Sequence, residues 1–159
     1  MDICEIITRD GIVVCQTAKE AESILSKLPA CLRLDLHKTL DTLDPNIPIF
    51  ETSQVCCISY VGRLSDTRNY AREDILDRIK YEQIEYGVLI FKRGKNINEP
   101  FTEDGSKAWV NKCIPFKHFE PLFIDDSEDH VLSVSSVGIK SVQIYPNDSL
   151  FDLLDLVPC

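Results

Sequence analysis

Four short apolar runs, separated by segments of helical character, constrain the fold of this chain more than any other feature. The runs are CLRLDL (31–36), VCCIS (55–59), YGVLIFK (86–92) and PLFID (121–125). Apolar residues recur near helical spacing in the segment 67–84 between them, and a short helix is expected over 106–113. Strands that alternate with helices are typical of a parallel sheet covered by helices. We therefore expect an α/β fold with a doubly wound, mostly parallel sheet.

The C-terminal part continues the same alternation. A helix over 130–139, closed by Gly138, is followed by a strand over 141–145 and a last amphipathic helix over 147–156. At 159 residues the chain has the length of one ordinary domain. We expect a single domain over residues 1–159, with a core over 31–159.

The first 30 residues are expected to form an extension of this core. The segment CEIITRDGIVVCQT predicts a β-hairpin, because two β-rich runs flank Asp10-Gly11, a pair suited to tight turns. A helix should follow, since Thr17 and Glu20 form a capping box and Pro29 ends the apolar pattern. The extension carries no motif; it could cover an edge of the sheet or contact a second chain.

Composition excludes several classes of protein. With 44% hydrophobic and 27% charged residues the chain is expected to fold, and no window approaches the roughly 20 apolar residues of a membrane span. The start lacks the pattern of a secretory signal, and the seven cysteines include no CxxC pair, so we expect a cytoplasmic protein with reduced thiols. The net charge of -9 disfavours non-specific binding to nucleic acid or anionic membranes, although a local basic patch could override it.

Polar residues stand directly after the apolar runs. In a doubly wound sheet the ligand lies at the carboxyl ends of the strands, so these residues should converge. They are Asp35, His37 and Thr39 after the first run, Ser59 after the second, and Asp125, Asp126 and Asp129 after the last, with Lys107 opening the helix before it.

Carboxylates gathered at one edge repel each other unless a cation lies between them, and an all-oxygen site suits Mg²⁺. A carboxylate, a hard metal ion, a hydroxyl and a lysine are also the groups needed to hold a phosphoryl group. The metal and the lysine offset its charge while one aspartate attacks phosphorus. The sequence therefore indicates phosphoryl chemistry at this edge.

The order of these motifs resembles the haloacid dehalogenase superfamily of phosphohydrolases. Its four motifs correspond to LRLDLHKTLD, VCCISYVG, the lysine of GSKAW, and PLFIDDSEDHV followed by VGIKSVQIY, over residues 31–145. The first and last motifs are specific as a pair, whereas the two middle ones are weak by themselves. The resemblance implies a Rossmann-like core and a Mg²⁺-dependent phosphatase that acts through an aspartyl-phosphate.

The resemblance also implies a role for each residue. Asp35 would be the nucleophile, Thr39 and Ser59 would hydrogen-bond the phosphoryl group or its surroundings, and Lys107 would balance its charge. The metal ligands would be Asp35, the backbone carbonyl of His37, Asp126, and Asp125 through water or as a support.

Each assignment has a simpler alternative. Asp35 alone could be an acidic turn residue, Ser59 a turn residue, and Lys107 a solvated lysine with Lys112 as its rival. Asp125 and Asp126 could cap the next helix. Arginine and lysine residues after two of the strands could either face the site or be ordinary surface charge.

His37 departs from the family pattern, because phosphatases of this kind usually have a second aspartate there. Histidine can transfer protons near neutral pH, so we expect it to act as the general acid and base. The spacing from Asp35 to Ser59 and on to Lys107 leaves no room for a large cap domain, which predicts an open site for a phosphorylated substrate, including a macromolecule. The alternatives are a weakly active or inactive module that binds a phosphorylated partner, and a nucleic-acid-end phosphatase.

Overall fold

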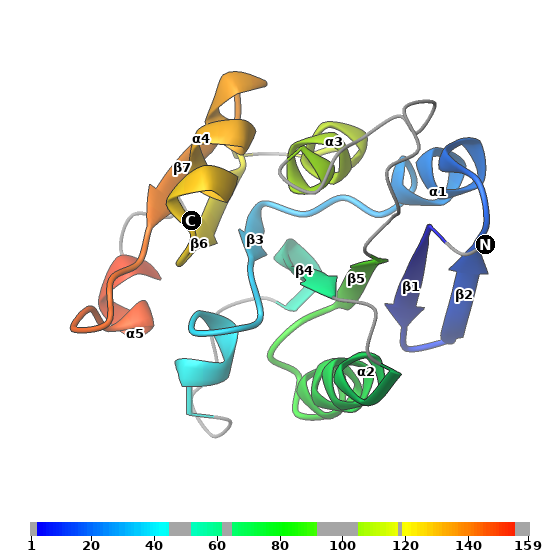
Figure 1. The fold of residues 1–159 in the computed structure, drawn as a ribbon, viewed down its shortest axis with the longest axis horizontal. Helices are drawn as coiled ribbons and strands as arrows, with labels where there is room; N and C mark the ends of the chain where they lie inside the picture. Colours follow the sequence, from blue (N-terminus) through cyan, green and yellow to red (C-terminus); the bar gives the residue numbers. More distant parts are fainter. Residues whose placement is uncertain (1–2, 45–51, 62–64, 92–104, 118, 155–159) are drawn as a thin grey trace.

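A seven-stranded mixed sheet forms the centre of the protein, in the order β2-β1-β5-β4-β3-β6-β7 (Figure 1). The structure, a computed structural model, describes residues 3–44, 52–61, 65–91, 105–117 and 119–154. The strands are β1 (Cys4–Thr8), β2 (Gly11–Cys15), β3 (Leu32–Leu34), β4 (Val55–Val61), β5 (Tyr86–Phe91), β6 (Leu122–Asp125) and β7 (Lys140–Gln143). The helices are α1 (Ala18–Leu25), α2 (Ser65–Lys80), α3 (Ser106–Cys113), α4 (Glu128–Ser136) and α5 (Leu150–Leu153), with 3-10 turns at Leu40–Thr42 and Thr52–Gln54.

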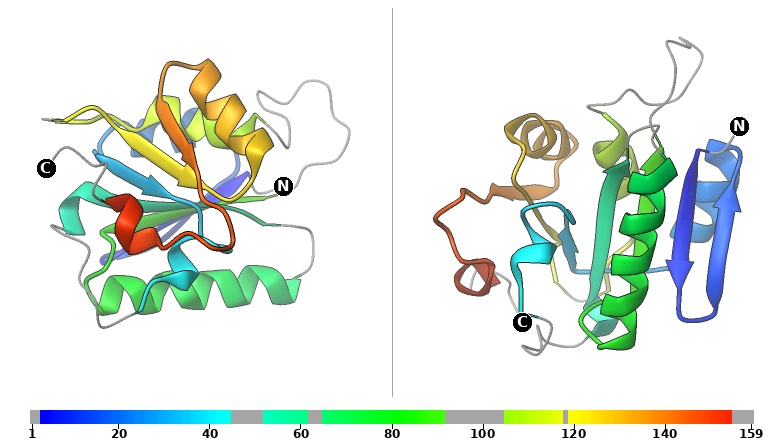
Figure 2. Two further views of the ribbon diagram at one scale, coloured as in Figure 1. Left: turned by 90° about the vertical axis from the view of Figure 1, so that its left-hand side faces the viewer. Right: turned by 60° about the horizontal axis from the view of Figure 1, so that its bottom comes forward.

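The five strands from β3 to β7 run parallel to their neighbours, which confirms the α/β prediction. Within the described residues, the antiparallel pairs are those of the N-terminal hairpin: β1 pairs with β2 on one side and with β5 on the other. The hairpin therefore extends the parallel part and covers its β5 edge (Figure 2, right).

Two apolar layers cover the two faces of the sheet. Alternate residues of β3, β4 and β5 pack against α2 through side chains such as Ala71, Ile75 and Ile79. The intervening residues of β1, β4 and β5 pack against α1 and α3 through Ala21, Leu25 and Val110. Figures 1 and 2 show α2 on one side of the sheet, with α1 and α3 opposite it. Burial of strands on both faces explains why their sequences are continuously apolar.

Some local predictions hold and others need correction. Thr17 does cap α1, since its hydroxyl accepts a hydrogen bond from the Glu20 amide at 3.2 Å. The hairpin turn, however, is one residue earlier than expected, because Thr8 pairs with Gly11 and leaves Arg9 and Asp10 between them. Gly11 begins β2 with φ +137°, a conformation that favours glycine.

Arg33 is fully buried and links the start of β3 to the end of α3. The Arg33 guanidinium donates to the backbone oxygens of Ala30 at 3.0 Å and Ile114 at 2.9 Å, and to that of Asn111 at 3.0 Å. The arginine thus satisfies these buried carbonyls and holds the two elements together. The first turn of α3 lies toward the carboxyl end of β3.

Candidate functional site

The direction of winding reverses beside β3. From β3 the chain proceeds to β4 and β5 on one side, and it then returns past β3 to form β6 and β7 on the other. Ligand sites of open α/β sheets lie at such a switch point, outside the carboxyl ends of the strands. Asp35 directly follows β3 and Asp125 is the last residue of β6, so both stand at this point. The Asp35 amide donates to the Ile124 carbonyl at 2.9 Å, which holds the two strand ends together.

A buried lysine joins these two aspartates. Lys107 Nζ lies 2.5 Å from Asp35 Oδ1 and 2.6 Å from Asp125 Oδ2, and all three residues are nearly inaccessible to solvent. Lys107 reaches the cluster from the first turn of α3. Its predicted rival Lys112 is exposed in the last turn of the same helix.

Asp125 has two further partners, from the helix that follows it. Its Oδ1 accepts a hydrogen bond from the Ser127 amide at 2.9 Å, and its Oδ2 lies 3.2 Å from His130 Nδ1. Ser127 caps α4 and accepts from the His130 amide at 3.4 Å, which fixes the start of that helix. Asp125 is therefore held by three partners, Lys107, Ser127 and His130.

The charges of the three groups are coupled. Burial raises the pKa of Asp35 to about 7, because the cost of burying its charge outweighs the attraction of Lys107. The negative charge of Asp125 raises the pKa of Asp35 as well. Burial would also raise the pKa of Asp125, but the hydrogen bond with His130 and the charge of Lys107 hold that pKa well below its usual range. The two carboxylates more than offset burial at Lys107 and raise its pKa. Asp35 thus titrates near neutral pH, while Asp125 stays ionised.

Asp126 completes a group of three carboxylates. Oxygen atoms of Asp35, Asp125 and Asp126 all lie within 4.8 Å of one another. Three negative charges against one lysine leave a deficit of positive charge at the strand ends, and oxygen donors suit a hard divalent cation. Asp126 is the partly exposed member of this group.

The loop after Asp35 turns two of the predicted residues in opposite directions. Hydrogen bonds from the Leu40 amide to the Asp35 carbonyl and from the Asp41 amide to the Leu36 carbonyl close this loop, both at 3.0 Å. The His37 side chain is 77% exposed, and its Nδ1 lies 3.9 Å from Asp41 Oδ2. Thr39 is fully buried, and its hydroxyl has no hydrogen-bond partner among the residues that the structure describes.

Ser59 does not end its strand. β4 continues to Val61, and Ser59 pairs with Leu89 inside the sheet, where it is 5% exposed. Alternation along β4 places it on the face of Cys57 and Val61, which packs against α2. Lys107 belongs to α3 on the opposite face, and within the described chain no side-chain hydrogen bond links Ser59 to the cluster.

The basic residues that follow the strands are only partly described. Arg72 forms a bidentate pair with Glu5 at 2.5 and 2.8 Å, and the Arg68 guanidinium lies 4.0 Å above the Phe91 ring. Both therefore have structural partners away from the cluster. Arg63, Lys92, Arg93 and Lys95 lie outside the described residues.

His130 is a further side chain in contact with the cluster. Asp129 beside it is exposed, while His130 turns inward to Asp125. The spacing in the sequence could have indicated this contact. His130 is the third residue after the helix cap Ser127, so it lies in the first turn of the helix, beside Asp125.

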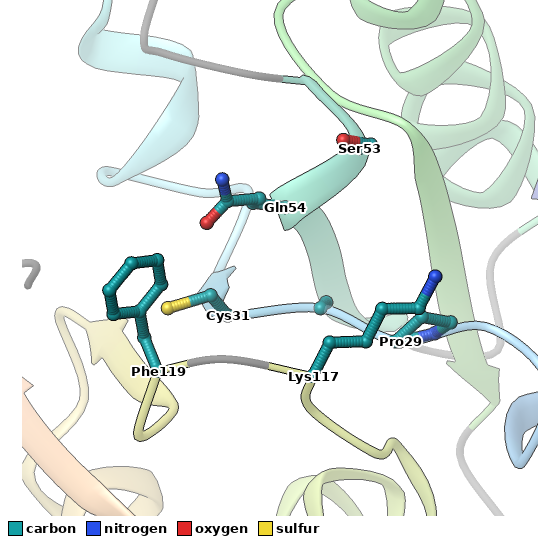
Figure 3. Close-up of a pocket in the computed structure, with 7 residues that line it drawn as sticks. Pro29, Cys31, Ser53, Gln54, Lys117 and Phe119 are labelled. Carbon is teal, nitrogen blue, oxygen red and sulfur yellow. The ribbon is translucent and has the colours of Figure 1, made fainter. Parts of the chain in front are cut away.

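Among the hollows formed by the described residues, two lie at opposite ends of the parallel strands. One has a volume of about 250 Å³ and is lined by Pro29, Cys31, Ser53, Gln54, Lys117 and Phe119 (Figure 3). These residues precede β3, β4 and β6, so this hollow lies at the amino ends, away from the cluster. The other has a volume of about 460 Å³ and includes Asp126 in its wall. The second hollow is therefore the one that adjoins the carboxylates.

No protein-family model matches the chain, and no curated protein matches it at a significant level of similarity. In the part of the chain that the structure describes, no helix combines the length and the apolar character needed to cross a membrane.

Proposed function

We propose that this protein is a Mg²⁺-dependent phosphohydrolase that acts through an aspartyl-phosphate on Asp35. The observation that carries the proposal is the buried Lys107, which contacts both Asp35 and Asp125 at the switch point of the sheet. Lys107 lies beside three carboxylates, so the cluster offers both a cation and anionic oxygen atoms to a charged ligand. The haloacid dehalogenase resemblance of the motifs agrees with this arrangement.

The charges of the cluster support a divalent cation together with a phosphoryl group. Asp35, Asp125 and Asp126 would hold the cation, with the backbone carbonyl of His37 as a further oxygen ligand. Bound Mg²⁺ would supply the positive charge that keeps Asp35 ionised and offsets the phosphoryl oxygens. Lys107 adds a second positive charge that needs no proton transfer.

Asp35 is the nucleophile of the proposed reaction. Its carboxylate oxygen forms a bond to phosphorus while the bond from phosphorus to the leaving oxygen breaks, and the leaving oxygen takes a proton from His37. A water molecule then gives a proton to His37 and attacks phosphorus, and the bond to Asp35 breaks. The products are the alcohol and inorganic phosphate, and both residues return to their starting states.

The surroundings of Asp35 contribute orientation. The Asp35 backbone is held by Ile124 and Leu40, and its carboxyl group by Lys107. The Thr39 hydroxyl, buried without a partner among the described residues, would gain one in a phosphoryl oxygen. His37 is exposed, which suits a proton donor that must reach the leaving group of a substrate lying across an open site.

The test is Mg²⁺-dependent hydrolysis of 4-nitrophenyl phosphate, compared between the wild type and Asp35→Asn. Asp129→Asn is the matched control, because Asp129 is an exposed carboxylate on the neighbouring helix. We expect turnover in the wild type and the control, its loss with EDTA, and its loss in Asp35→Asn. Acid quenching followed by intact mass measurement should show a phosphoryl adduct in the wild type and none in Asp35→Asn.

His37→Gln separates the proton-transfer role from the phosphoryl site. We expect the adduct to persist in this variant while turnover falls, because the phospho-enzyme then lacks the group that takes a proton from the attacking water. Equal turnover in Asp35→Asn and the wild type would refute the proposal. Binding of phosphate without any turnover or adduct would instead assign the site to recognition of a phosphorylated partner.

A further inference from the structure

We infer that the hollow beside Asp126 is a subsite for an aromatic leaving group, so that the preferred substrates are phosphomonoesters that carry an aromatic ring close to the phosphoryl group. This inference rests on the proposed phosphohydrolase function. It adds what that function leaves open, namely the class of the alcohol.

The hollow lies between two segments that approach each other at the carboxyl ends of the strands. Lys38 and Thr42 come from the loop after Asp35, and the lining residues Gln143–Pro146 and Asp148 come from the end of β7 and the segment that follows it. Figures 1 and 2 show these two segments side by side. Asp126 belongs both to this wall and to the carboxylate group, so the hollow continues directly from the phosphoryl site.

Tyr145 provides a fixed aromatic wall. Its hydroxyl donates to Gln143 Oε1 at 3.1 Å, and Gln143 Nε2 donates to the Asp126 carbonyl at 3.3 Å. The Tyr145 amide donates to Asp148 Oδ2 at 2.9 Å, which fixes the backbone as well. The ring is thus tied at both ends and remains 57% exposed. A preorganised exposed ring loses little entropy when a second ring packs on it.

The rest of the lining leaves room for a ring beside Tyr145 and places polar groups around it. Pro146 flanks Tyr145 with apolar surface, and the polar side chains of the lining are those of Lys38, Thr42, Asp126, Gln143 and Asp148. The volume of about 460 Å³ is that of a pocket for a small organic group and is too small for a folded partner. Lys38 stands on the opposite wall with φ +56°, and its ammonium group has no ion pair in the described residues. It can lie beside the phosphoryl group or over the face of the ring.

The experiment compares benzyl phosphate with propyl phosphate. Their leaving alcohols have similar acidity, so a difference in rate reports how the enzyme binds the alcohol part and not how readily the alcohol leaves. The quantity measured is the ratio of their kcat/KM values with Mg²⁺ present. We expect benzyl phosphate to be preferred, and we expect Tyr145→Ala to lower that ratio about tenfold, as the loss of an aromatic contact predicts. Tyr81→Ala is the control, since Tyr81 is 58% exposed just after α2 and does not line the hollow.

A ratio near one in the wild type, or a preference that survives Tyr145→Ala, overturns the subsite and leaves the phosphohydrolase function intact. If neither ester is hydrolysed, the proposed function fails, and binding then decides the subsite separately. Benzylphosphonate and propylphosphonate would be titrated against the wild type and Tyr145→Ala with Mg²⁺ present, by calorimetry. Tighter binding of benzylphosphonate that depends on Tyr145 retains the subsite, whereas equal or absent binding refutes it.

Discussion

The buried carboxyl group of Asp35 should make the stability of the metal-free protein fall as the pH rises, and Asp35→Asn should abolish this effect. The pKa of Asp35 is raised from 3.8 to about 7. In the unfolded chain the group loses its proton near pH 4, whereas the folded protein retains it until about pH 7. Over this interval the unfolded state binds fewer protons, so the free energy of unfolding decreases with pH.

The magnitude follows from the size of the shift. A raise of about three pKa units, at about 1.4 kcal/mol per unit, amounts to about 4 kcal/mol as an upper value. Asparagine resembles the protonated aspartate in shape and stays neutral. We therefore expect Asp35→Asn to match the wild type near pH 4 and to be more stable near pH 8, with the difference developing between those values.

The assay is urea unfolding near pH 4, 6 and 8 in EDTA, with Asp129→Asn as the control for a lost surface carboxylate. Mg²⁺ at about 100 times its dissociation constant should restore about 2.7 kcal/mol to the wild type at pH 8 and little to Asp35→Asn. A difference between the two proteins that does not change with pH would show that Asp35 ionises normally. The argument from burial would then be wrong.

Three further substitutions test the supports of the site. Lys107→Met should destabilise the protein by about 3–5 kcal/mol at neutral pH, because it removes the cation that the two buried carboxylates share; the exposed Lys112→Met should change the urea midpoint little. Gly87→Ala should cost about 1–3 kcal/mol, since the new Cβ would lie 2.6 Å from Ile75 Cγ2. Combining it with Ile75→Ala should cost less than the sum of the two single changes, as a double-mutant cycle would show. Arg33→Met should lower the thermal midpoint and destabilise by about 3 kcal/mol, because it strands several buried carbonyls.

The alternation of apolar runs and helical segments was enough to predict the α/β class, because strands buried on both faces require continuous apolar sequence. Thr17 and Gly138 marked a helix start and a helix end for equally local reasons, and both predictions are confirmed. The expectation that Asp35 and Asp125 lie together followed from their positions after two strands and from the switch-point rule. Their contact through Lys107 agrees with that expectation.

Other features depended on contacts between distant segments. The sequence placed the end of β4 too early, at Ser59. Pairing with β5 continues through Ser59 and Tyr60 and carries the strand to Val61. The choice of Lys107 over Lys112 was not decided by the sequence, since both lie on one short helix, and only the packing of that helix on β4 and α4 turns one lysine inward.

The sequence by itself therefore determined the kinds of element, their order and the chemistry available at the strand ends, because these depend on local periodicity and residue type. Tertiary structure decided which groups touch. Arg33 links β3 to α3, His130 turns to Asp125, and Tyr145 is tied to the Asp126 loop through Gln143. Some of these contacts join residues that are far apart in the chain, and others depend on how a side chain is rotated. No pattern along the sequence specifies the distances between the groups involved.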